Sequence, residues 1–150
     1  MNLLGQTDLK WRRYTEDEDY GYPVDYAAAL LSAREDGHID VLYRWAPNCY
    51  CHFHRHAAAT TSVVLEGELH VTDVDPDTGE ALERRIRRPG DYAYTTPGDQ
   101  HMECGGPDGA LVLFTLYAPE GRLAETLAQD GTTMDVWELE PILARRRARA

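Results

Sequence analysis

Hydrophobic residues recur with a period of two at the start of the central region. Over residues 37–45, the side chains of Ile39, Val41, Tyr43 and Trp45 fall on every second position. Because successive side chains of a strand point to opposite faces, this period indicates a half-buried strand. Further short extended runs follow, separated by turns rich in Gly, Pro, Asp and Asn. The predicted extended runs cover residues 37–45, 50–56, 60–65, 69–74, 81–86, 92–95, 101–104 and 111–117.

About eight short strands with turn signals between them are typical of an all-β sandwich or barrel. The flanking segments differ. The acidic run at residues 16–19 suits a solvated face, and the good helix formers at 26–34 favour a short helix or an irregular segment. Near the other end, the spacing of Leu123 and Leu127, and then residues 136–148, predicts helices. We expect one domain made of an N-terminal arm packed on the barrel (1–36), the barrel (37–118) and a C-terminal helical extension (119–150).

Composition narrows the class of partner. The 150 residues hold 26 acidic and 15 basic side chains, a net charge of −11, which argues against nucleic acid and anionic membranes as partners. No stretch approaches the ~18 apolar residues of a membrane span, and the first residues lack an apolar run of signal-peptide length. Three cysteines, Cys49, Cys51 and Cys104, cannot form a closed disulfide framework. We therefore expect a reduced, cytoplasmic protein.

Three of the six histidines lie close together, at His52, His54 and His56. Residues two apart on a strand share a face, so these imidazoles would project together, while Cys51 and Phe53 would point the other way. Imidazole nitrogens bind Zn, Fe, Cu and Ni well, and alternate histidines can converge on one ion. The alternative is a row of polar side chains on an exposed strand face.

A second set of residues gives this region a family resemblance. A known motif contains a histidine pair, then a carboxylate, and ends in a glycine. With Gly67 as that final glycine, the histidine pair falls on His54 and His56, and the carboxylate position falls on Thr60. Asn48 stands at the opening glycine and tolerates the same backbone conformation. The glycines at 90 and 98, followed by His101, fit a second motif, with Thr96 and Gly105 in place of its usual Pro and Asn.

With both motifs in order, residues 37–117 resemble a small single-domain cupin. The resemblance implies an all-β fold, a double-stranded β-helix (cupin jelly-roll barrel), and a metal held by His54, His56 and His101. Thr60 at the carboxylate position would leave three neutral ligands and a more Lewis-acidic ion. In this register His52 is a nearby inward-facing residue. Protonation of the histidines would reduce metal occupancy below about pH 6.

Three-histidine cupins of this kind resemble acetylacetone, dihydroxyacetophenone and thiol dioxygenases. The resemblance implies one divalent transition metal, with Fe(II) favoured over Zn or Ni, and a small enolisable, phenolic or thiol substrate that reacts with O₂. Two alternatives stay open: a non-catalytic metal- or ligand-binding sensor, and a Zn- or Ni-dependent isomerase or lyase. A homodimer is expected because unpaired sheet edges favour association.

Two further residues are candidates for the site. Glu103 lies two residues past His101, so on a strand it shares the inward face and could be a further ligand or an acid/base group; the alternative is a rim carboxylate facing solvent. Tyr94 has inward parity and could orient a substrate oxygen, although barrel lining is the ordinary role of such a tyrosine. Cys51 and Cys104 are off-parity from the histidines, so we expect no thiolate ligand.

Overall fold

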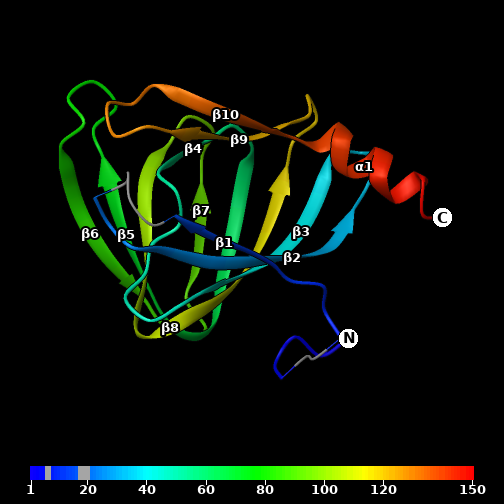
Figure 1. Cartoon of the computed structure of the whole chain (residues 1–150), viewed down its shortest axis with the longest axis horizontal. Helices are drawn as coiled ribbons and strands as arrows, with labels where there is room; N and C mark the ends of the chain where they lie inside the picture. Colours follow the sequence, from blue (N-terminus) through cyan, green and yellow to red (C-terminus); the bar gives the residue numbers. More distant parts are fainter. Residues whose placement is uncertain (6–7, 17–20) are drawn as a thin grey trace.

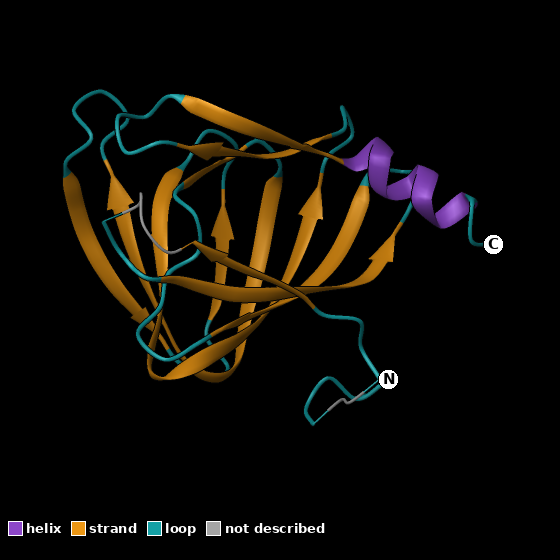
Figure 2. Cartoon of the chain, in the orientation of Figure 1, coloured by secondary structure: helices purple, strands orange, loops and turns teal. Residues whose placement is uncertain are grey.

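The computed structural model describes residues 1–5, 8–16 and 21–150. Of the acidic run in the N-terminal segment, only Glu16 falls within these residues, and the rest of that prediction lies outside them. Strands dominate the described chain (Figures 1 and 2). They are β1 (Arg12–Glu16), β2 (Val24–Ala33), β3 (His38–Trp45), β4 (His54–His56), β5 (Ala59–Val74), β6 (Ala81–Arg87), β7 (Tyr92–Thr95), β8 (Gln100–Tyr117), β9 (Arg122–Leu127) and β10 (Thr133–Glu138), followed by the helix α1 (Leu139–Arg147).

All the strands belong to one curled antiparallel sheet. Seven of them follow one another in the order β1-β2-β3-β8-β4-β9-β10, and β5 pairs with β6, β7 and β8. The long strands β5 and β8 pair along most of their length, from Ala59 opposite Tyr117 to Asp73 opposite His101. Figure 1 shows how the strands wrap around a common interior while α1 lies at one end. The predicted all-β jelly-roll architecture is confirmed.

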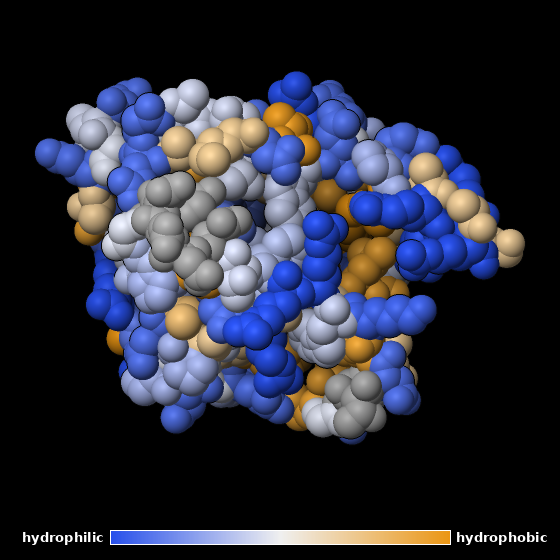
Figure 3. Space-filling view, in the orientation of Figure 1, coloured by the Kyte–Doolittle hydropathy of each residue, from blue (hydrophilic) through white to orange (hydrophobic). Residues whose placement is uncertain are grey.

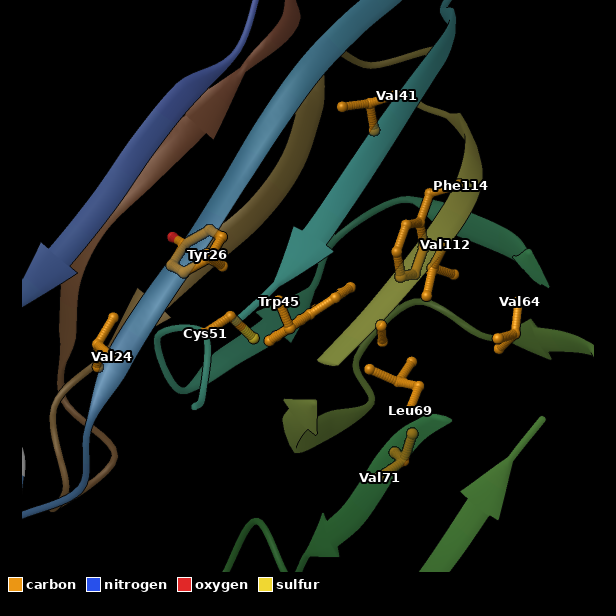
Figure 4. Packing of buried hydrophobic residues seen from close by; sticks show 11 residues of the cluster. Val24, Tyr26, Val41, Trp45, Cys51, Val64, Leu69, Val71, Val112 and Phe114 are labelled. Atoms are coloured by element: carbon orange, nitrogen blue, oxygen red, sulfur yellow. The ribbon is translucent and has the colours of Figure 1, made fainter. Parts of the chain in front are cut away.

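The interior is filled by apolar side chains from alternate strand positions. On β5, Leu69 and Val71 are fully buried, and on β8 Val112 is as well. Figure 4 shows Tyr26, Trp45 and other members of this cluster pointing inward from different strands. Burial of apolar surface at roughly 25 cal/mol per Å² is the main force that closes the sheet.

Two segments predicted to favour helix are strands. Residues 26–34 lie mostly in β2, whose Ala27 to Ala29 pair with β3, because this pairing overrides the helix propensity of alanine. Leu123 and Leu127 lie on β9 and are both buried. A spacing of four residues fits a helix face and a strand face equally, so a short apolar pattern does not distinguish the two. Both terminal segments therefore contribute strands to the sheet.

The turn expected between the predicted runs 60–65 and 69–74 is also absent, since β5 runs through Gly67 with irregular register on both sides. Gly67 has φ +70°, and a Cβ added there would lie 2.2 Å from the backbone oxygen of Gly109 on β8. Glycine is required because a side chain would collide with the neighbouring strand. The predicted runs 101–104 and 111–117 are likewise parts of a single strand, β8.

The helix expected over residues 136–148 is present in part as α1 (Leu139–Arg147), but residues 136–138 belong to the strand β10. The helix buries Leu139 and Leu143 in a second apolar cluster with Ile39 and Leu123. Arginines occupy its last turn, where positive charge is favourable at the end of the helix dipole. In the described residues, no helix is both long enough and apolar enough to cross a membrane.

Candidate metal centre

Three histidines converge inside the barrel from two paired strands. His54 and His56 alternate on β4, and His101 on β8 lies directly opposite His54 in the antiparallel ladder. The Nε2 atom of His56 is 3.1 Å from that of His54 and 3.0 Å from that of His101. His101 is 1% exposed and His56 is 6% exposed. The histidine set predicted from the cupin motifs is thus brought together.

The outer nitrogens fix the orientation of each ring. His54 Nδ1 lies 2.8 Å from the carbonyl oxygen of His52, to which it donates, and His101 Nδ1 lies 3.1 Å from the Asp99 carboxylate. His56 Nδ1 lies 3.1 Å from Thr60 Oγ1. Because the Thr60 hydroxyl donates its own proton to the carbonyl of Ala58, at 3.0 Å, its oxygen accepts from His56.

In its neutral form, each of the three rings therefore carries its proton on Nδ1 and directs an Nε2 lone pair inward. The Nε2 lone pairs of His54 and His101 each face that of His56 at about 3 Å, and lone pairs placed in this way repel unless a cation or a proton lies between them. His54, His56 and His101 would hold such a cation through these nitrogens, which suit Zn, Fe, Cu and Ni. The residues present thus fit a divalent transition metal with open positions.

Glu103 is part of the same cluster. It is 3% exposed, with Oε1 3.3 Å from His101 Nε2 and Oε2 3.9 Å from His54 Nε2. The predicted inward orientation is confirmed, and the alternative of a solvent-facing rim position is wrong. Glu103 and the three histidines form a group of donor atoms within 4.8 Å of one another. A carboxylate from β8 therefore lies in the cluster, although Thr60 stands at the carboxylate position of the motif.

Burial and charge set the protonation of this cluster. Desolvation is the main cause that lowers the pKa of His54 and His56, and the neighbouring histidines lower it further. Burial also acts to lower the pKa of His101, but the Glu103 and Asp99 carboxylates outweigh it and raise that pKa to about 9. Burial opposes ionisation of Glu103, yet the surrounding histidines hold its pKa well below the usual range. Before a metal binds, His101 and Glu103 thus form a buried ion pair.

The centre opens onto a cavity of about 80 Å³ with an aromatic wall. Figure 3 shows a hollow on this face of the molecule, between β1 and β9. The wall combines residues distant in sequence, since Tyr26 comes from β2 and Trp137 from β10. Its aromatic members are Tyr26, Tyr43, Trp45, Phe114 and Trp137.

Two neighbours in sequence, Cys51 and His52, both line this cavity. His52 faces inward as expected, with Nδ1 2.8 Å from the Tyr26 hydroxyl. The expectation that Cys51 points away is wrong: its Sγ lies 3.8 Å from His54 Nδ1 and 3.8 Å from Glu103 Oε2. Because β4 begins only at His54, strict alternation does not apply to residues 51–53. Burial and the Glu103 charge raise the pKa of the Cys51 thiol well above its usual value, so it stays protonated.

Tyr94 does not reach the centre. It is 57% exposed and lies outside the cavity, so its expected inward orientation is wrong. On β7 the buried residue is Thr95, which pairs with Thr60. A shift of one residue in strand parity moves a side chain to the opposite face.

Sequence reasoning did not find the aromatic wall. Tyr43 and Trp45 are two residues apart on the strand predicted over residues 37–45. Their shared inward face could therefore have been predicted from the alternation of hydrophobic positions on that strand. Trp137 and Tyr26 gave no such signal, because both segments were expected to be helical or irregular. Cys51 was excluded by parity alone.

No protein-family profile matches the sequence, and no curated protein matches it either. Solved structures do match. A cupin 2 conserved barrel domain protein from Rhodopseudomonas palustris is similar over 83% of this chain and 81% of its own, with 15% identity and a TM-score of 0.65. An acetylacetone dioxygenase from Acinetobacter johnsonii is similar over 91% of this chain and 85% of its own, with 13% identity and a TM-score of 0.63.

A cupin-like protein from Thermotoga maritima is similar over 82% of this chain and 90% of its own, with 20% identity and a TM-score of 0.60. The chain therefore has the cupin fold, as its motifs indicated. An oxalate oxidase and an oxalate decarboxylase also share this fold. Because one fold supports different reactions, the activity has to be argued from the site.

Proposed function

We propose that this chain is a metal-dependent cupin enzyme, a non-haem Fe(II) dioxygenase that oxidises a small enolisable, phenolic or thiol substrate bound directly to the metal. One observation carries the proposal: the Nε2 atoms of three histidines point at one another. The Nε2 atom of His56 is 3.1 Å from that of His54 and 3.0 Å from that of His101, and the Nδ1 atom of each ring has a hydrogen-bond partner. Imidazole nitrogens bind both Fe(II) and Zn, and Fe(II) would supply the redox chemistry that a reaction with O₂ requires. The structural similarity to an acetylacetone dioxygenase supports the proposed dioxygenase activity.

The protein's own residues supply geometry and exclude water. His54, His56 and His101 would hold the ion, and Glu103 adds a negative charge beside them. When bound, Fe(II) supplies the redox chemistry and the Lewis acidity that the side chains lack. The aromatic wall keeps bulk water away, which strengthens the electrostatic attraction between the centre and a substrate anion.

An enolisable, phenolic or thiol substrate loses a proton when it binds as an anion. His52 lies in the cavity wall outside the ligand set, and its Nδ1 is 2.8 Å from the Tyr26 hydroxyl. This pair is the proposed acceptor and relay for the substrate proton. The Cys51 thiol stays protonated next to Glu103 and does not compete for the metal.

The test combines metal analysis with oxygen uptake. Protein loaded anaerobically with Fe(II) should retain about one ion per chain and consume O₂ with a member of a panel of diketones, phenols and thiols. His101→Ala should lose both properties while its circular dichroism spectrum is unchanged. If the purified protein binds no transition metal under these conditions, the proposal fails.

Other outcomes would support the two alternatives. Tight zinc that resists chelation, together with no O₂ uptake on the whole panel, would indicate a metal- or ligand-binding sensor. Turnover that persists under strict anaerobiosis with Zn or Ni would indicate an isomerase or a lyase that uses the ion as a Lewis acid.

A further inference from the structure

The outer face of the sheet carries a continuous row of uncharged side chains. Strand pairing places Tyr92 of β7 directly opposite Val63 of β5, and Val63 opposite Leu113 of β8. The row continues to Leu42 of β3 and Ala29 of β2. It lies on the outside of the barrel, because its member on β5 alternates with residues that are buried in the interior. An apolar row thus crosses five strands on the face turned away from the metal centre.

The chain itself covers one end of this row. Three residues of the N-terminal segment, Leu3, Leu9 and Trp11, pack against the end that holds Leu42. Leu42 is accordingly fully buried, whereas Tyr92 at the other end is 67% exposed. The outer face is therefore apolar throughout, but only the part over β2 and β3 is covered by the chain's own residues.

The uncovered part lies over β7 and the stretches of β5 and β8 that pair beside it. Two tyrosines dominate it, and the second of them, Tyr94, is 57% exposed. We call this surface the outer patch, and its members are Thr61, Val63, Tyr92, Tyr94, Leu113 and Thr115. None of these side chains is charged. Protein interfaces are enriched in Tyr and depleted of charge at their centres, so the outer patch has the composition of an interface.

Charge indicates that a second copy of this chain covers the outer patch. With a net charge of −11, two copies repel wherever their acidic surfaces face one another. In a two-fold dimer a patch meets itself, so an uncharged patch avoids contacts between like charges. The open edge of β6 does not, because four of the five residues at 84–88 are arginines. A partner of another sequence would be attracted to this acidic chain through basic side chains, and the outer patch offers them no counter-charge.

The available area sets the strength of such a pairing. A standard interface takes about 800 Å² from each partner. The exposed parts of the two tyrosines supply roughly 250 Å² of this, since a Tyr side chain offers about 150–250 Å² in full. The partly buried members of the outer patch and its rim have to supply the remainder. The pairing is therefore expected to be reversible rather than permanent.

We infer that two copies of this chain pair through the outer patch about a two-fold axis, with Tyr92 and Tyr94 at the centre of the interface. The sheet separates this interface from the metal centre, because Thr60 contacts His56 while its neighbour Thr61 points outward. Neither tyrosine lines the cavity. The pairing therefore stands or falls independently of the proposed enzymatic activity.

Sedimentation velocity over a hundredfold range of protein concentration tests the pairing. The unmodified protein should form a reversible dimer. Tyr92→Glu brings two negative charges together across the axis and should raise the dissociation constant of the dimer at least tenfold. Leu82→Glu is the matched control, since Leu82 is 60% exposed on β6, outside the outer patch, and this variant should leave the dimer unchanged. Added salt should strengthen the dimer, because it screens the repulsion between two acidic copies.

A monomer at every concentration would overturn the inference, and so would a dimer that Tyr92→Glu and Leu82→Glu affect equally. A dimer that salt weakens would also contradict it, because such a dimer is held by opposite charges. If Tyr92→Glu does not fold, hydroxyl-radical footprinting of the unmodified protein decides the matter. Oxidation of Tyr92 and Tyr94 should fall as the dimer forms while that of Leu82 stays constant, and tyrosines that remain unprotected in the dimer would place the interface elsewhere.

Discussion

Thr60 stands where the cupin motif has a carboxylate, yet it still acts on the metal site. Its hydroxyl accepts from His56 Nδ1 and donates to the carbonyl of Ala58. This relay keeps the inward nitrogen of His56 unprotonated. The residue at the carboxylate position of the motif thus orients the ring of His56, while a carboxylate from β8, that of Glu103, lies in the cluster.

Thr60→Val should weaken metal binding while the protein remains folded. Valine has nearly the same shape but cannot accept from His56, and partners that orient a ligand typically contribute 10- to 100-fold to metal affinity. We expect a loss of roughly tenfold, measured by Co(II) titration against a competing chelator. Thr61→Val is the control, because Thr61 points to the opposite face of β5. Equal affinity in both variants would contradict the relay.

Metal binding should depend on pH through His101. Its pKa of about 9 means that, at neutral pH, the ring must lose a proton before Nε2 can bind an ion. The apparent affinity should therefore rise with pH, roughly tenfold per unit between pH 7 and 9, and should level off above. Calorimetry in two buffers of different ionisation enthalpy should show about one proton released per ion at pH 7.5.

Glu103→Gln separates this mechanism from ordinary histidine titration. Without the carboxylate, the pKa of His101 falls, because burial then outweighs the remaining Asp99 charge. Proton release at pH 7.5 should largely disappear in this variant. Persistent release would show that another group holds the proton. Because of the buried ion pair, we expect competition between protons and the metal to begin near pH 9 rather than at the value of about 6 expected from an unperturbed imidazole.

At the scale of elements, the short strand β4 positions two of the candidate metal ligands, His54 and His56, within three residues. It pairs with β8 on one side and β9 on the other, so its backbone is held from both edges. Alternation then directs His54 and His56 to the same interior. Outside this held stretch the alternation fails, and Cys51 and His52 reach the same cavity.

The close pairing of β5 with β8 depends on Gly67. Gly67→Ala combines a positive φ with a contact of 2.2 Å to the Gly109 backbone oxygen, and should lower the free energy of unfolding by about 3 kcal/mol. Gly79→Ala is the matched control: its φ of +72° is similar but its Cβ would meet open space. It should cost about 1 kcal/mol. Urea denaturation measures both, and equal losses would refute the role of the close approach.

At the scale of the whole molecule, the two ends of the strand order meet beside the cavity. Tyr14 on β1 stacks on Tyr26 with ring centroids 4.9 Å apart, and its ring is 5.8 Å from that of Trp137 on β10. An aromatic contact therefore bridges the strands at the two ends of the sheet. Residues from the first and last parts of the chain thus shape one small site.

A bound ion should stabilise the fold. A ligand that binds only the folded state adds about 2.7 kcal/mol at 100 times its Kd, which raises the Tm of a chain of this size by about 5–10 °C. Thermal melts with and without Co(II) should show this shift in the unmodified protein and in His52→Ala, but not in His101→Ala. Loss of the shift in His52→Ala alone would show that the histidine register is wrong. The predicted homodimer and cytoplasmic location stay predictions, and sedimentation analysis tests the first.

The sequence alone predicted the three histidines of the candidate metal centre, because alternation and motif spacing are local properties. His54, His56 and His101 were predicted from the resemblance to the cupin motifs, and the parity of Glu103 with His101 made it a candidate whose role stayed open. The same reasoning failed where local patterns are ambiguous: Leu123 and Leu127 fit helix and strand alike, and Tyr94 was assigned to the wrong face.

Only the tertiary structure decided what surrounds the ligands. Tyr26, Trp45 and Trp137 meet because strand pairings join residues that are far apart in the chain. The buried ion pair of Glu103 with His101 and the inward position of Cys51 follow from that assembly. Spacing along the chain sets which residues share a face, but long-range pairing sets which faces share an interior.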